Sequence, residues 1–233
     1  MDMCSELLKT TLKKLCIVVI FGISFGYIEA AVVVYLRTIF HPDGFTFPLT
    51  NFGAGPLWRP LLFTEVGREA ATIVLILTAV WLFGQSLQQR FAYFLTIFAV
   101  WDIFYYVWLK VLINWPASIM DWDILFLIPI TWASPVLAPV LISVTLLFFA
   151  IIILYRCGRD RPLKVTSIEW LVFSLAGFIL VTCFCIAGLH IAEPDFQSHF
   201  YWLLFAVGYL LAIALFLRCL FRPDDRKEPA GVV

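Results

Sequence analysis

Six long apolar runs divide this chain of 233 residues, and each is close to the length that a helix needs to cross a lipid bilayer. The hydrocarbon core of a bilayer is about 30 Å thick, so a spanning α-helix takes about 20 mostly apolar residues. Hydrophobic residues make up 63% of the chain and charged residues 14%, whereas soluble domains have about 45–50% and about 25%. The runs cover residues 15–36, 61–83, 91–113, 136–155, 169–190 and 200–219. The sequence therefore predicts a single all-α domain, a polytopic membrane bundle of six transmembrane helices in contact with lipid.

The stretch between the third and fourth runs is too long for one span and too apolar for a plain loop. Residues 121–155 would form a helix of about 50 Å, and three prolines interrupt them. Ser134 followed by Pro135 is typical of a helix start, because serine caps the first turn and proline suits the first helical position. We expect the fourth helix to begin near Pro135, after a short re-entrant or interfacial segment over residues 121–131.

Basic residues predict the orientation, because Lys and Arg gather on the cytoplasmic side of membrane proteins. With the N-terminus inside, twelve of the sixteen Lys and Arg residues lie on that side. We expect both termini in the cytoplasm, including a short polar tail at 223–233, and an integral protein of a bacterial inner membrane. The formal net charge is zero, and no basic stretch is rich enough to indicate a nucleic-acid partner.

Four carboxylates and one guanidinium lie inside the first three apolar runs, besides Lys110 near the end of the third. A charge at the bilayer centre costs about 2.5–3.5 kcal/mol at the lowest estimates, so such residues usually face the protein interior and mark a site. They are Glu29, Glu65, Arg68, Glu69 and Asp102. Four carboxylates and one guanidinium do not balance, so a proton, a metal ion, a cationic ligand or another side chain must neutralise the remainder.

The predicted topology brings these residues to a common level in the outer half of the membrane. Glu65, Arg68 and Glu69 share one helix face, because their spacing is i, i+3, i+4. Asp102 lies near mid-membrane on the third helix, with Tyr106 above it. We therefore expect one acidic pocket, open to the outer face, in the first three helices.

Small residues on the first helix predict a close helix contact beside Glu29. Gly22, Gly26 and Ala30 recur every four residues, as in the ridges where membrane helices approach closely. The loop that follows, residues 37–60, is rich in glycine, proline and aromatic residues. A structured loop of this length often covers a site, so we expect it to lie over the pocket.

Candidate catalytic roles follow from side-chain chemistry. Glu69 and Asp102 are candidates for metal ligand or for general acid and base, and Tyr106 for a proton donor. Arg68 is the candidate clamp for an anion or phosphate. Alternatively, Arg68 forms only a structural ion network with its neighbouring glutamates, and Asp102 only locks helices together through a hydrogen bond.

Four further residues are candidates for ligand binding, and Lys110 would also reduce the charge deficit. They are Glu29, Glu65, Trp101 and Lys110.

The cofactor is unknown, and a divalent metal ion is a candidate. All three histidines, His41, His190 and His199, are expected on the outer side, where imidazole and carboxylate could act as ligands. No HxxxH, HExxH or ExxH pattern supports this. The candidate ligands are Glu29, Glu69, Asp102 and His190.

Three function classes remain open. The first is an intramembrane enzyme, metal-dependent or acid–base, acting on a lipid-like or small hydrophobic ligand. The second is a small cation- or proton-coupled transporter, which needs a polar path to the cytoplasm that the inner halves of the helices hardly supply. The third is an accessory or assembly subunit, in which a membrane-protein partner balances the charges.

Overall fold

The computed structural model describes residues 2–42, 44–50, 52, 58–159 and 161–222. These residues are mostly helical, and six helices are long and apolar enough to cross a membrane. The helices are α1 (Asp2–Phe40), α2 (Trp58–Phe83), α3 (Leu87–Ile113), α4 (Leu137–Cys157), α5 (Ser167–Leu189) and α6 (Trp202–Leu220). The prediction of six membrane-spanning helices is confirmed at this level, whereas the predicted tail at 223–233 lies outside the described residues.

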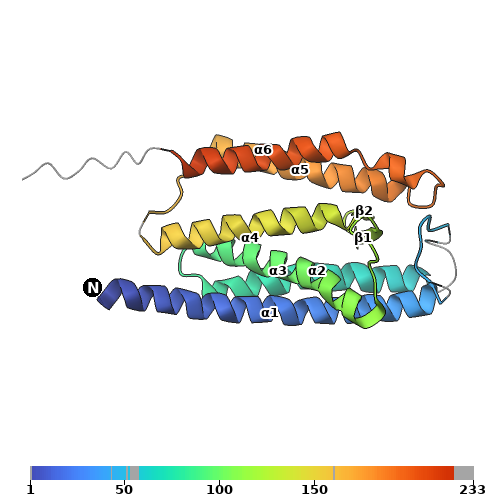
Figure 1. The fold of residues 1–233 in the computed structure, drawn as a ribbon, viewed down its shortest axis with the longest axis horizontal. Coiled ribbons are helices and arrows are strands. Elements are labelled where there is room, and N and C mark those ends of the chain that lie inside the picture. The colour runs from blue at the N-terminus through green and yellow to red at the C-terminus, as the bar shows by residue number, and fades with distance from the viewer. Residues whose placement is uncertain (1, 43, 51, 53–57, 160, 223–233) are drawn as a thin grey trace, which may run out of the picture.

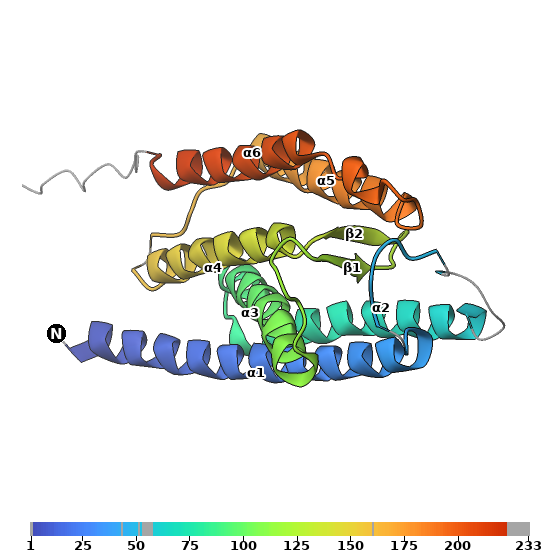
Figure 2. The ribbon, with the colours of Figure 1, turned by 45° about the vertical axis from the view of Figure 1, so that its right-hand side comes forward.

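The helices α1, α2, α4, α5 and α6 lie roughly along one axis, in layers, and α3 runs obliquely to them (Figures 1 and 2). α1 and α2 lie on one side, α3 and α4 in the middle, and α5 and α6 on the other side. The start of α1 and the end of α6 lie at the same end of the bundle, which we call the terminal end (Figure 1). We call the opposite end the hairpin end, after the β-hairpin described below. It carries the loop after α1 and the connection between α5 and α6.

A two-stranded antiparallel hairpin precedes α4, where a short interfacial or re-entrant segment is expected from the sequence. Its strands are β1 (Trp122–Phe126) and β2 (Trp132–Pro135). The hairpin is a departure from the expected all-α fold. Ser134 does not cap α4, because it lies in β2 opposite Asp123, and α4 begins at Leu137 without a side-chain cap.

Glycines permit two close contacts that fix the positions of α3 and the hairpin. A Cβ on Gly26 of α1 would lie 3.0 Å from the Trp101 carbonyl oxygen of α3, which agrees with the expected ridge of small residues. A Cβ on Gly188 of α5 would lie only 1.9 Å from the Thr131 carbonyl oxygen of the hairpin turn. The backbones therefore approach at distances that only glycine allows.

An apolar cluster fills the terminal half of the bundle. It joins five helices, α1, α2, α3, α4 and α6, through buried residues such as Val18, Ile76, Ile97, Leu154 and Phe216. A second cluster, which is rich in aromatic residues, joins the hairpin to α5, α6 and their connection. Large apolar side chains also cover the outside of the helices, as expected for a surface in contact with lipid.

Basic side chains gather at the terminal end, where they bond to loop and helix-end carbonyls. Lys14 donates to the Phe83 carbonyl oxygen, and Arg222 to that of Lys164. This distribution agrees with the predicted orientation, although the orientation itself stays a prediction.

Candidate functional site

A cavity of about 380 Å³ lies in the half of the bundle nearer the hairpin end. Its walls come from α1, α2, α3, α4, α5, the hairpin and the loop after α1, and most lining side chains are apolar or aromatic. This volume is within the range of about 300–1,000 Å³ that is usual for small-molecule sites.

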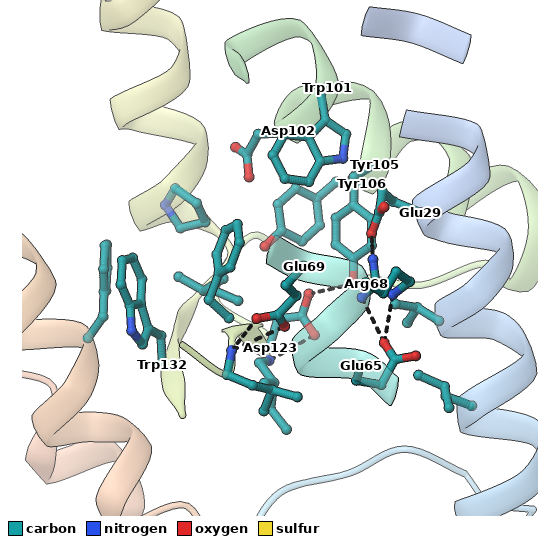
Figure 3. A pocket seen from close by; sticks show the side chains of 18 of the residues that line it. Glu29, Glu65, Arg68, Glu69, Trp101, Asp102, Tyr105, Tyr106, Asp123 and Trp132 are labelled. Atoms are coloured by element: carbon teal, nitrogen blue, oxygen red, sulfur yellow. Dashed lines mark hydrogen bonds and ion pairs between the residues drawn. The ribbon is translucent and has the colours of Figure 1, made fainter. Parts of the chain in front are cut away.

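All the predicted site residues except Lys110 and His190 line this cavity (Figure 3). They come from three helices and surround a common space, with Trp132 of β2 on the side opposite Arg68. The lining residues among them are Glu29, Glu65, Arg68, Glu69, Trp101, Asp102 and Tyr106. The structure therefore brings together the five charges that the sequence places within apolar runs.

Lys110 lies elsewhere and does not balance charge in the cavity. It is exposed, and its Nζ donates to the carbonyl oxygens of Asn114 at 3.4 Å and Pro116 at 2.9 Å. Its role here is to close the C-terminal turn of α3.

Arg68 pairs with two glutamates and joins α2 to α1. Its Nη2 lies 2.7 Å from Glu65 Oε2, and its Nη1 contacts Glu29 Oε2. Thr72 adds a hydroxyl that donates to the Arg68 carbonyl oxygen at 2.7 Å. These contacts balance much of the charge of Glu29, Glu65 and Arg68. They agree with the alternative that Arg68 forms a structural ion network with the glutamates.

A second buried ion pair, between Arg37 and Asp123, joins α1 to the hairpin and was not identified from the sequence. Arg37 Nη2 lies 2.9 Å from Asp123 Oδ1, and the Tyr105 hydroxyl donates to Asp123 Oδ2 at 3.2 Å. Asp123 is only 2% exposed. The one available signal was an aspartate inside the apolar strand-forming sequence WDILF.

Burial and Arg37 determine the electrostatics at this end of the cavity. Burial raises the pKa of Asp123 above its usual value, although the neighbouring Arg37 opposes this shift. Burial and the positive charge of Arg37 both lower the pKa of His41, which also lines the cavity. The Arg37 guanidinium lies against the rings of Phe45 and Trp115, at 4.0 and 3.8 Å from their centroids.

Glu69 and Asp102 differ from the other acidic residues, because the described residues give neither of them an ion pair. Both oxygens of Glu69 accept from the Leu127 backbone N–H of the hairpin, at 3.1 and 2.9 Å. Asp102 Oδ2 accepts from the Ser143 hydroxyl of α4 at 2.8 Å. With Asp123 added to the predicted four, five carboxylates and two guanidinium groups line the cavity.

Three buried donors on the cavity walls have no hydrogen-bond partner among the described residues. They are Arg37 Nη1, Trp101 Nε1 and Trp132 Nε1. Buried polar atoms in proteins are nearly always hydrogen-bonded. The cavity can therefore offer a ligand both acceptors and donors within a mainly apolar lining.

The predicted metal ligands are divided between two places. Glu29, Glu69 and Asp102 line the cavity. His190 lies in the connection between α5 and α6, where it clusters with Glu193 and His199. His199 and Glu193 could not be grouped with His190 from the sequence alone, because their spacing matches no common metal motif.

The loop after α1 contributes to the cavity, as expected. His41, Phe45 and Phe52 of this loop are among the lining residues. Phe45 also stacks edge-on against Phe47, with ring centroids 5.5 Å apart. Residues 53–57 of the predicted covering loop lie outside the described part of the chain.

No protein-family model, curated protein or solved structure matches this chain.

Proposed function

We propose that the protein is an intramembrane enzyme in which Glu69 and Asp102 act as an acid–base pair on an amphipathic, lipid-like substrate. The supporting observation is that these two carboxylates lie on the walls of a largely apolar cavity without a cation partner among the described residues. Carboxyl groups that only balance structural charges would have the ion pairs that Glu29, Glu65 and Asp123 have.

The two carboxyl groups are held in different ways, which suits two different roles. The Leu127 N–H holds Glu69 from the hairpin, whereas Ser143 holds Asp102 from α4. In the proposal, one group donates a proton to the substrate while the other removes one. Tyr106, which lines the same cavity, serves as a further proton donor.

The unpartnered donors indicate the polar part of the substrate. Arg37 Nη1 and Trp101 Nε1 are buried and available, so they favour a group that is rich in acceptors, such as a phosphate or a carboxylate. The role of anion clamp thus passes from Arg68, which already contacts two carboxylates, to Arg37. Apolar lining residues such as Phe98 and Phe184 would contact the hydrocarbon part.

The apolar cluster in the terminal half favours an enzyme over a transporter. Its buried residues, such as Ile76 and Ile97, fill the bundle between the cavity and the terminal end. A carrier needs a polar path through this region. With the basic terminal end in the cytoplasm, the proposed site lies in the outer half of the membrane.

The test is to identify the molecules that stay bound to the purified protein. Full-length protein is prepared in nanodiscs, and its bound molecules are extracted and compared by mass spectrometry with those of Glu69→Gln and Asp102→Asn. Both substitutions keep the acceptor for the Leu127 N–H or the Ser143 hydroxyl. We expect an amphipathic molecule in all three, with a different chromatographic retention time or mass in the variants, because they retain substrate that the wild type converts.

Two glycines provide a matched control for occupation of the cavity. Gly177 of α5 lines the cavity, Gly67 of α2 does not, and a Cβ on either would have no neighbour within 4 Å. Gly177→Leu should reduce the amount of bound molecule, and Gly67→Leu should not. Equal amounts of bound molecule in both glycine variants would contradict binding in the cavity. Bound molecules with the same chromatographic retention time and the same mass in the wild type and in both carboxylate variants would contradict acid–base turnover.

A further inference from the structure

The connection between α5 and α6 brings two histidines and a glutamate together, outside the cavity. His190 follows the end of α5, Glu193 lies three residues on, and His199 ends the short 3-10 helix η1 (Phe196–His199). One potential ligand atom from each residue lies within 4.8 Å of the other two. These are residue types that bind divalent transition metals.

One separation within this cluster, between His199 and Glu193, is that of ligands around one ion, and the other, between His190 and Glu193, is the shorter distance of a hydrogen bond. His190 Nδ1 lies 2.8 Å from Glu193 Oε1, and His199 Nε2 lies 3.4 Å from Glu193 Oε2. Ligand atoms bound to tetrahedral zinc at about 2.0–2.2 Å are about 3.3–3.6 Å apart. The two imidazole rings are parallel within 10°, with centroids 3.8 Å apart, so both lie beside the same space and must turn toward each other for their nitrogens to bind one ion.

His199 adds an independent observation. Its Nε2 is buried and has no hydrogen-bond partner among the described residues, despite the nearby Glu193 carboxylate. A buried ring nitrogen without a partner is uncommon, whereas a metal ion would satisfy it directly. Asp195 Oδ2, at 3.7 Å from the same nitrogen, is available as a fourth ligand.

We infer that His190, Glu193 and His199 form a binding site for a divalent transition-metal ion, with zinc as the best match. Two imidazoles and one carboxylate are ordinary zinc ligands, and the fourth position is taken by Asp195 or water. This site is separate from the proposed acid–base chemistry and does not depend on it.

The backbone around the cluster is ordered enough to hold such a site. The Glu193 N–H donates to the His190 carbonyl oxygen at 3.0 Å, and the Phe196 N–H donates to that of Glu193 at 3.2 Å. Phe196 and Phe200, on either side of His199, are buried in the aromatic cluster of the hairpin end. The ligands therefore come from a turn that its own packing holds in place.

The metal would stabilise the turn after α5, which contacts the loop that lines the cavity. The Leu49 N–H of this loop donates to the Ile191 carbonyl oxygen at 2.8 Å, and Phe47 lies 5.3 Å from Phe196 between ring centroids. Phe47 in turn contacts Phe45, which lines the cavity. Metal binding at the turn thus connects, through two contacts, to the cover of the cavity.

Zinc titration of the full-length protein tests the site. The protein carries a purification tag without histidine, is stripped with a chelator and is then titrated with zinc, with elemental analysis after removal of excess metal. We expect one zinc per chain and a higher melting temperature when zinc is bound. His190→Ala and His199→Ala should each weaken zinc binding by at least about tenfold, because even partners outside the ligand set contribute about 10–100-fold.

The controls separate this site from the cavity. His41→Ala removes the third histidine, and Glu69→Gln and Asp102→Asn alter the cavity carboxylates, so all three should keep the full zinc content. Zinc lost in Glu69→Gln or Asp102→Asn but kept in His199→Ala would overturn the inference, as would a wild type that binds no zinc. If the histidine variants do not fold, the absorption spectrum of the wild type with cobalt bound in place of zinc tests the ligands. A spectrum that shows no nitrogen ligands on the cobalt ion would contradict the site.

Discussion

The two halves of the helix bundle are held together by different interactions. In the terminal half, α1 to α4 pack through an apolar cluster with fully buried side chains such as Ile76 and Ile97. In the half nearer the hairpin end, the same four helices, together with α5, the hairpin and the loop after α1, surround a cavity lined by five carboxylates and two guanidinium groups. Buried charges are costly in a membrane, so stability alone does not account for the second arrangement.

The hairpin half itself contains two kinds of carboxylate. Asp123, Glu29 and Glu65 have arginine partners that tie α1 to the hairpin and to α2. Glu69 and Asp102 have only neutral donors among the described residues. The first kind has a structural explanation, and the difference is the basis of the proposal that the second kind is catalytic.

The largest effect on stability is expected from Asp123→Ala. It leaves Arg37 buried without its carboxylate, and breaking a buried pair in this way costs about 3–5 kcal/mol. The melting temperature in detergent should fall far below that of the wild type. The double variant Arg37→Met with Asp123→Leu should recover a large part of the loss, since it leaves no unpaired charge, and failure to recover would contradict this account.

A smaller loss is expected from Gly188→Ala, which tests the contact between α5 and the hairpin. The added methyl would overlap the Thr131 carbonyl oxygen, and overpacking of this kind costs about 1–3 kcal/mol. Gly177→Ala on the same helix, where a Cβ meets nothing within 4 Å, is the control. Equal melting temperatures for the two variants would show that the hairpin does not rest on α5.

In the terminal half, Ile97→Val should lower stability without changing what the protein binds. Ile97 is fully buried, and loss of one methylene there costs about 0.5–1.5 kcal/mol. The melting temperature measures the first effect, and mass spectrometry of bound molecules the second. A changed set of bound molecules would break the proposed division between the two halves.

The smallest effect on stability is expected from Glu69→Gln and Asp102→Asn. Neither group has an ion pair to lose among the described residues, and both amides keep their acceptor oxygen, so the change should stay within about 0.5 kcal/mol. Glu29→Gln is the contrasting variant, because it removes one of the two carboxylates that contact Arg68. A loss for Glu69→Gln as large as for Glu29→Gln would favour a structural role for Glu69.

Hydropathy and charge patterns were sufficient to identify the helices and most of the charged residues of the cavity. Apolar runs of about 20 residues leave few alternatives to membrane spans. Charges within such runs must turn inward, which is why Glu29, Glu65, Arg68, Glu69 and Asp102 could be grouped before any contact was known. The small residues Gly22 and Gly26 identified the face at which α3 packs.

The partners of these residues could not be read from the sequence, because they come from distant parts of the chain. Arg37 and Asp123 are 86 positions apart, one at the start of the predicted covering loop and the other in the predicted re-entrant or interfacial segment. Lys110 was a candidate for reducing the charge deficit, with a position at the outer interface as the alternative, and its side chain bonds to nearby carbonyl oxygens at the end of α3.

From the sequence alone it follows that six segments are long and apolar enough to cross a membrane and that the charges within them belong together, because bilayer thickness and the cost of a buried charge act on each residue wherever it lies. Which carboxylates have partners depends on the folded chain, because a hydrogen bond or an ion pair requires two groups to meet at about 3 Å. In the folded chain, His190 also lies outside the cavity, together with Glu193 and His199. The folded hairpin and the turn after α5 determine these contacts, because they set the positions of Asp123, Leu127 and the two histidines.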